Sequence, residues 1–216
     1  MSILAIDAAG PRAGIALLGE DGALAWKSFT PGRPGLIETL PVLLREAVAH
    51  KPEAVAVTIG PGSFTGLRTA LSLAQGFAAA AGIPLLGVTV AEAYRAALPS
   101  LDRPLWVFVR ARRDRMFLLR DDRGEDRAEA FADADVPVPE APVALAGDAA
   151  DEAAAQLSGK GADVVLTGAK DLDPVWVGQA ALARRAAGLP AHEAVPLYID
   201  PPEAKLPAAG LRPPPR

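Results

Sequence analysis

The 216-residue sequence contains no cysteine and only two histidines, His50 and His192. The lack of cysteine excludes disulfides, thiolate zinc sites and cysteine nucleophiles, and two distant histidines do not predict a metal site. The sequence has no run of about 18 apolar residues without charge, so it predicts no membrane span. The N-terminus lacks the basic region of a signal peptide. We therefore expect a cytoplasmic protein with no metal of its own.

Aromatic side chains and an excess of positive charge are also scarce. Aromatic residues make up 5% of the chain, and 22 basic against 26 acidic residues give a net charge of -4. RNA-binding modules need local positive charge and aromatic stacking surfaces, so a stand-alone RNA-binding module is disfavoured. Half of the residues are hydrophobic, and the mean hydropathy is +0.20. This content can fill the core of one large or two small domains.

The hydrophobic pattern of residues 1–100 predicts one α/β half. The expected strands are 3–7, 12–18, 23–29, 54–59 and 85–88, and the expected helices are 36–49, 65–81 and 90–98. Three strands followed by alternating helices and strands are typical of a ribonuclease-H-like half-domain with a mixed sheet. Pro41 is expected to restrict the first helix to a short first turn.

Residues 101–200 predict a smaller α/β half that resembles a reduced copy of the first. The expected elements are a hairpin of strands 105–111 and 116–120, a long loop over 121–142, strands 143–147 and 164–167, and helices 148–157 and 174–187. The loop is expected because its sequence is charged and interrupted by proline. Residues 201–216 form a proline-rich tail that need not be ordered.

A glycine-rich loop joins the buried strand 54–59 to the helix that follows. Its candidate functional residues are Gly60, Gly62, Ser63, Phe64, Thr65, Gly66 and Arg68. Such a loop can direct backbone N–H groups at an anion, but its spacing is neither that of a P-loop nor GxGxxG in the dinucleotide-binding register. The alternative is a tight turn in which Ser63 or Thr65 caps the helix and Phe64 is an apolar anchor in the core or against a partner.

The sequence GPGSFTGLR at 60–68, followed by AQG at 74–76 and GIPL at 82–85, resembles the signature of the TsaB (YeaZ) family. ILAID at 3–7 and AVPLY at 194–198 match in the same order, so the resemblance spans nearly the whole chain. TsaB proteins are the dimerisation subunits of the bacterial machinery that makes threonylcarbamoyladenosine at position 37 of tRNA.

The resemblance implies an actin/Hsp70/sugar-kinase-like fold of two ribonuclease-H-like halves. It also implies a non-catalytic scaffold that binds and stabilises the catalytic transferase TsaD, with the ATPase TsaE as a further partner. The chain alone is expected to form a homodimer, and tRNA is expected to be met through the complex. No cofactor of its own is expected, and ATP or ADP at the interface with the partner is the candidate nucleotide, with the glycine-rich loop near that junction.

The residues at the expected active positions also favour a non-catalytic role. Active relatives hold phosphate and Mg²⁺ with an Asp, a Gly and a Thr in the first hairpin, where this chain has DAAG at 7–10. TsaD-type enzymes need a pair of histidine ligands, and His50 and His192 lie far apart in the sequence. Ser63 has no neighbouring histidine base. An autonomous small-molecule kinase or peptidase of the same fold is the alternative.

Two helices of the first half are expected to form a four-helix interface with TsaD or with a second copy. The helix at 65–81 is apolar or small on most of its circumference, which is typical of a helix covered on more than one side. The residues expected at this interface are Leu36, Leu40, Leu67, Leu71, Ala74, Gln75 and Ala78.

Two segments depart from the family pattern. Residues 32–35 read GRPG where relatives commonly have a histidine, and 108–112 read FVRAR where relatives have an AIDAR-type strand. The second departure creates a basic cluster of Arg110, Arg112, Arg113 and Arg115. This cluster is a candidate contact for tRNA phosphates or for an acidic partner, and a solvated hairpin is the alternative.

Overall fold

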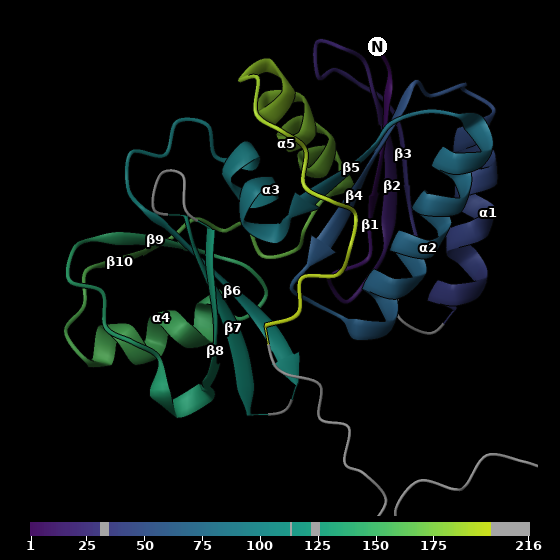
Figure 1. Cartoon of the computed structure of the whole chain (residues 1–216). Coiled ribbons are helices and arrows are strands. Elements are labelled where there is room, and N and C mark those ends of the chain that lie inside the picture. Colours follow the sequence, from purple (N-terminus) through teal and green to yellow (C-terminus); the bar gives the residue numbers. More distant parts are fainter. Residues whose placement is uncertain (31–34, 113, 122–125, 200–216) are drawn as a thin grey trace, which may run out of the picture.

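The first half of the chain forms a five-stranded mixed sheet with the strand order β3-β2-β1-β4-β5 (Figure 1). The computed structural model describes residues 1–30, 35–112, 114–121 and 126–199. The elements of this half are β1 (Ile3–Asp7), β2 (Gly14–Leu18), β3 (Leu24–Phe29), α1 (Leu36–Val48), β4 (Ala54–Gly60), α2 (Phe64–Ala81), β5 (Leu85–Thr89) and α3 (Val90–Ala97). The element order predicted from the sequence is confirmed.

Helices cover both faces of this sheet, which explains the continuous apolar run in β4. α1 and α2 pack on one face, and α3 and α5 (Pro174–Ala186) pack on the other (Figure 1). Because both faces of a central parallel strand are covered, all seven residues of β4 are buried. The expected interruption of α1 does not occur, since the helix continues through the exposed Pro41 while Leu40, Leu43 and Leu44 are buried.

The second half repeats the strand order of the first. Its elements are β6 (Leu105–Arg112), β7 (Arg115–Asp121), β8 (Asp126–Ala132), η1 (Asp133–Asp135), β9 (Val143–Ala146), α4 (Ala150–Gly159) and β10 (Val164–Leu166), with the order β10-β9-β6-β7-β8. β6 pairs antiparallel with β7 and parallel with β9, as β1 pairs with β2 and β4. The reduced-copy hypothesis agrees with this topology.

The expected long loop over residues 121–142 is wrong in its first part, because β8 pairs antiparallel with β7 there. β8 is an edge strand, and edge strands tolerate the charged residues that suggested a loop.

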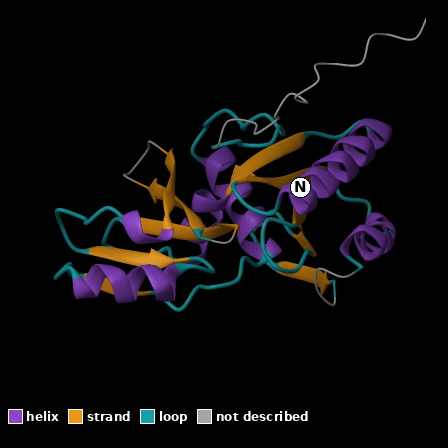
Figure 2. Ribbon diagram, turned by 90° about the horizontal axis from the view of Figure 1, so that it is seen from below, coloured by secondary structure: helices purple, strands orange, loops and turns teal. Residues whose placement is uncertain are grey.

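One hydrophobic cluster joins the two sheets. It contains Ile3 and Ala5 of the first sheet, Val107 and Val109 of the second, and Tyr94 of α3. α3 lies between the sheets, whereas α4 covers the opposite face of the second sheet. Figure 2 shows helices between the sheets as well as at the ends of the molecule. The two halves therefore share a core and do not form separate cores joined by a linker.

After α5 the chain runs back across the first half. We call residues 188–199 the strap (yellow in Figure 1). The strap is held by hydrogen bonds from Gly87 N to His192 O (3.0 Å), from Gln75 Nε2 to Ala194 O (2.8 Å) and from Leu197 N to Ile59 O (2.8 Å). The tail expected at 201–216 lies outside the described residues. No helix in the described ranges is long and apolar enough to cross a membrane.

Candidate functional site

The glycine-rich loop forms a tight turn in which the N–H groups of Ser63 and Gly66 donate to acceptors within the chain. Ser63 is the N-cap of α2, and its Oγ accepts a hydrogen bond from Gly66 N at 3.3 Å. The Ser63 N–H donates to Ala9 O at 2.7 Å. Helix starts leave N–H groups that either a cap or an anion can satisfy. The geometry supports the tight-turn interpretation, with Ser63 and not Thr65 as the cap.

Two glycines of the loop are required by a close approach of the chain to itself. A Cβ on Gly62 would lie 2.5 Å from Ala9 O, and a Cβ on Gly66 would lie 2.1 Å from Ala8 O. Both distances are far below van der Waals contact, so any side chain would displace the backbone. The glycines therefore bring the start of α2 against the turn between β1 and β2.

Phe64, Arg68 and Tyr198 form an exposed aromatic cluster beside this loop. Phe64 is 59% exposed, so of the two expected anchoring places, the core or a partner, the core is excluded. The Arg68 guanidinium carbon lies 4.0 Å from the Phe64 ring centroid, and Arg68 donates to Tyr198 Oη from Nε (3.1 Å) and Nη2 (2.9 Å). The cluster joins the start of α2 to the end of the strap.

Most of the residues expected at a helical interface lie instead in the core. Leu40, Leu67, Leu71, Ala74 and Ala78 are at most 5% exposed and pack against the strands. They are spaced at three, four and seven residues along their helices, so they share the face that meets the sheet. Gln75 is exposed and binds the strap, and the Leu36 side chain lies outside the described part.

The outward face of α2 is made of different residues. Arg68, Ser72, Gln75, Gly76 and Ala79 are all exposed and follow helical spacing; we call this set the docking stripe. Small side chains on a helix allow another helix to approach closely, because the distance between helix axes depends on the side chains at the contact. The stripe begins at the exposed aromatic cluster, so small residues and large anchors lie on one continuous face.

In the part of the chain that the structure describes, residues of both halves line a small cavity in the cleft between them. This cavity is about 20 Å³ and is lined by Ala9, Gly10, Pro11, Pro61, Val90, Tyr94, Val109, Asp148, Lys170, Asp171 and Leu172. This volume holds about one water molecule, whereas ligand pockets occupy roughly 300–1,000 Å³. The Tyr94 hydroxyl closes the cleft further by donating to Lys170 O at 2.7 Å.

Asp7 lies at the end of β1 beside this cleft. Burial raises its pKa to about 6, although hydrogen bonds from Ala9 N (3.1 Å) and Thr58 Oγ1 (2.8 Å) to its Oδ1 oppose the shift. The negative charge of Asp173 raises the pKa further. The carboxyl group is therefore held inside the protein, where it supports the turn after β1.

Asp148 follows β9, the strand that takes in the second sheet the place of β4 in the first, and the sequence analysis missed it. Burial raises the pKa of its carboxyl group, and its Oδ1 accepts a hydrogen bond from Arg110 N at 2.7 Å. The repeat could have pointed to Asp148 from the sequence. The residues GD at 147–148 directly follow β9, just as the glycine-rich loop directly follows β4.

The basic cluster is partly neutralised in the fold. Arg110 Nη1 donates to both carboxylate oxygens of Asp133, at 2.8 and 2.7 Å, and Nη2 donates to Glu152. The Arg115 side chain is half-buried. The side chain of Arg112 and all of Arg113 lie outside the described residues. Arg110 thus bridges β6 to the segment after β8 and to α4.

The two histidines contact different elements and do not lie together. The ring of His50 lies 6.1 Å from that of Trp26, while His192 Nε2 lies 3.1 Å from Glu92 Oε1. These are separate places in the fold. Within the described ranges, no group of three or more His, Asp or Glu residues could hold a metal ion.

Two halves with the same mixed-sheet order and a shared core have the actin/Hsp70/sugar-kinase-like fold. The family model described as TsaD, tRNA N6-adenosine threonylcarbamoyltransferase, matches residues 36–195. The chain belongs to this family.

Solved structures share this fold. One is described as an uncharacterized protein with similarity to peptidase YeaZ from Pseudomonas aeruginosa: it has a TM-score of 0.72 at 23% identity, with 92% of this chain and 99% of that chain covered. YeaZ from Pseudomonas aeruginosa has a TM-score of 0.68 at 24% identity, and the match covers 91% of this chain and 99% of that chain. A ROK family protein from Streptococcus pneumoniae, in complex with sucrose, has a TM-score of 0.53 at 10% identity, and the match covers 87% of this chain and 99% of that chain. The TsaB (YeaZ) resemblance found in the sequence agrees with these likenesses.

A curated relative matches only a short part of the chain. The tRNA N6-adenosine threonylcarbamoyltransferase of Corynebacterium aurimucosum is 43% identical over 51 residues, which are 24% of this chain and 15% of that protein. The match therefore spans about a seventh of the relative's length.

Proposed function

We propose that this protein acts in threonylcarbamoyladenosine modification of tRNA as a non-catalytic subunit that binds and stabilises a catalytic TsaD paralogue. The observation that carries the proposal is the docking stripe on α2, which is exposed in a chain of the transferase family and begins at the exposed aromatic cluster. Its position on an outer helix makes it accessible to a second protein.

The chemistry of this face suits protein binding. Interface hot spots are enriched in tyrosine, tryptophan and arginine, and the cluster supplies Tyr198 and Arg68 beside Phe64. Phe64 and Tyr198 are 59% and 55% exposed, so they bury apolar area when a partner covers them. Arg68 is held between hydrogen bonds and a ring, so it loses little rotamer freedom on binding.

The small size of the cavity that the described residues line between the halves supports the non-catalytic part of the proposal. A nucleotide-dependent enzyme of this fold needs an open site between its halves, and here the cavity is about 20 Å³. The turn after β1 carries alanines at 8 and 9 where phosphate-binding hydroxyls would be useful. Asp7 is engaged by Thr58 and the backbone.

The remaining assignments extend the same proposal. Without TsaD, the docking stripe pairs with that of a second copy. In the complex, the ATPase TsaE joins, and ATP or ADP binds at the partner junction near the glycine-rich loop. Transfer RNA binds to the complex and not to this chain alone, because the chain's net charge of -4 does not attract the RNA phosphates.

The test is reconstitution of the tRNA modification from purified components. Threonylcarbamoyladenosine is measured by nucleoside mass spectrometry with TsaD and the other components, with and without this chain. We expect modification to depend on both proteins and this chain alone to turn over neither ATP nor peptides. Modification that is unchanged when the chain is omitted would contradict the proposal, and turnover by the isolated chain would favour the kinase or peptidase alternative.

A further inference from the structure

A pocket lies at the edge of the first sheet, on β5, α5 and the strap. Its volume is about 270 Å³, close to the lower end of the range of ligand pockets. The lining residues are Leu86, Gly87, Ala181, Arg184, Arg185, Gly188, Leu189 and Ala191. None of them belongs to the glycine-rich loop, the docking stripe or the cleft, so the proposed function does not account for this pocket.

One part of the lining is apolar. Leu86 of β5 and Ala181 of α5 contribute hydrocarbon surface, and Leu189 and Ala191 of the strap add to it. The Leu189 side chain is 53% exposed. A bound hydrocarbon group would remove this surface from water, which favours binding in proportion to the area covered.

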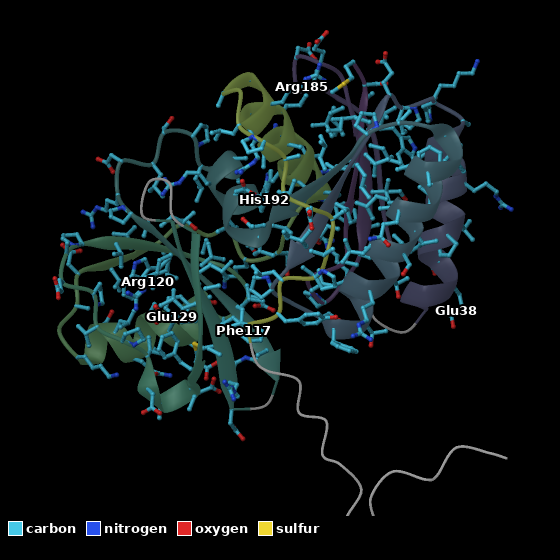
Figure 3. All side chains as sticks on the ribbon, in the orientation of Figure 1. Glu38, Phe117, Arg120, Glu129, Arg185 and His192 are labelled. Atoms are coloured by element: carbon cyan, nitrogen blue, oxygen red, sulfur yellow. The ribbon has the colours of Figure 1, made fainter. Side chains whose placement is uncertain are left out.

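The other part of the lining is cationic. It contains two arginines and no acidic residue. Arg184 is already committed, because its Nη1 donates to Glu92 Oε1 and its Nε donates to Pro190 O, both at 2.6 Å. His192, labelled in Figure 3, contacts the same Glu92 at 3.1 Å. Arg184 therefore lines the pocket and holds the strap in place through its hydrogen bond to Pro190.

Arg185 differs from Arg184 in its partners. Its side chain is exposed (Figure 3), and its Nη1 donates to Met1 Sδ. In the part of the chain that the structure describes, no carboxylate forms an ion pair with Arg185. A guanidinium has five donors in a planar fork that fits a carboxylate with two parallel hydrogen bonds. Arg185 therefore has donor capacity for an anion at the pocket.

We propose that this pocket binds a small carboxylate with an apolar body of about four to eight carbons, a size suited to the lower end of ligand pockets. The carboxylate pairs with Arg185, and the hydrocarbon body lies against Leu86 and Leu189. Because the strap forms one wall, the bound molecule also holds the strap against β5. This is a small-molecule site in addition to the proposed partner-binding function and independent of it.

The experiment is isothermal titration of the full chain with hexanoate at constant ionic strength, with hexan-1-ol and acetate as comparison ligands. We expect saturable binding of hexanoate. Hexan-1-ol and acetate should bind at least about tenfold more weakly, because hexan-1-ol has no negative charge and acetate has no long hydrocarbon group. Arg185→Gln is expected to weaken hexanoate binding at least about tenfold. Arg45→Gln, which removes an exposed arginine from the last turn of α1, is the matched control and should leave binding unchanged.

A second variant, Ala191→Trp, tests the location by filling the pocket from an exposed strap position. It should abolish hexanoate binding while the circular dichroism spectrum stays that of the wild type. The proposal is overturned if hexanoate does not bind saturably up to about 10 mM. It is also overturned if Arg185→Gln and Ala191→Trp bind hexanoate as the wild type does.

Discussion

Gly66 and Gly76 lie on the same helix, but packing requires a glycine only at Gly66. A Cβ at Gly66 would lie 2.1 Å from Ala8 O, while a Cβ at Gly76 would meet nothing within 4 Å. We expect Gly66→Ala to lower the free energy of unfolding by about 1–3 kcal/mol, because the backbone must move. Gly76→Ala should raise it by about 0.5–1 kcal/mol, because alanine favours the helix. Urea unfolding of both variants measures the difference, and equal effects would contradict the packing account.

Asp7 predicts an unusual pH dependence of stability. Its native pKa is about 6, above its ordinary value of 3.8, so the folded state binds the proton more tightly than the unfolded chain. This contribution to stability is complete below about pH 4 and is lost as the pH rises through about 6. A shift of about two units corresponds to about 3 kcal/mol at full loss.

Asp7→Asn isolates this effect, because asparagine does not titrate and keeps an oxygen for Thr58 and Ala9. The stability of the wild type relative to the variant should fall by about 2 kcal/mol between pH 4 and pH 7, measured by urea unfolding. Parallel pH profiles for the two proteins would show that Asp7 does not titrate as described.

At the scale of elements, α2 shows where sequence reasoning reaches its limit. Its start, its length and Ser63 as one of two candidate caps could be predicted from the glycine-rich loop and the apolar pattern. Its outward face could not, because alanine and other small residues occur all around the helix and give a weak periodic signal. Ala74 and Ala78 therefore resembled interface positions, although they are buried.

Charge on the outward face of α2 is expected to break association without unfolding the chain. The double variant Ser72→Glu and Ala79→Glu places two carboxylates on the exposed docking stripe. It should weaken binding to TsaD or to a second copy at least about tenfold, because unpaired charges would be buried in the interface. Circular dichroism and light scattering measure folding and association.

The matched control for this prediction is Ala155→Glu with Ser158→Glu on the exposed face of α4. It adds the same charges elsewhere and should associate as the wild type does. By contrast, Ala74→Glu with Ala78→Glu should unfold the protein, since both positions lie in the core. If the docking-stripe variant associates as tightly as the control, α2 does not form the interface.

The whole molecule combines two copies of one strand order around a shared core. The repeat could be predicted from element order, because buried strands and amphipathic helices have distinct periods. The ion pairs that join distant segments could not. Arg110 resembled part of a nucleic-acid contact, yet the fold brings Asp133 and Glu152 to it from segments 23 and 42 residues away.

The strap also emerges only at this scale. Residues 188–199 carry few periodic signals, yet they connect the pocket at β5 with Tyr198 at the exposed aromatic cluster. The same segment thus contributes to two surfaces that a local reading of the sequence does not connect.

The most direct test of the central claim is the solution mass of the purified chain alone and mixed with TsaD from the same organism, by size-exclusion chromatography with light scattering. The account predicts a homodimer that exchanges into a one-to-one heterodimer when TsaD is added. A chain that does not associate with a demonstrably folded TsaD would contradict the claim that this protein acts as its binding subunit.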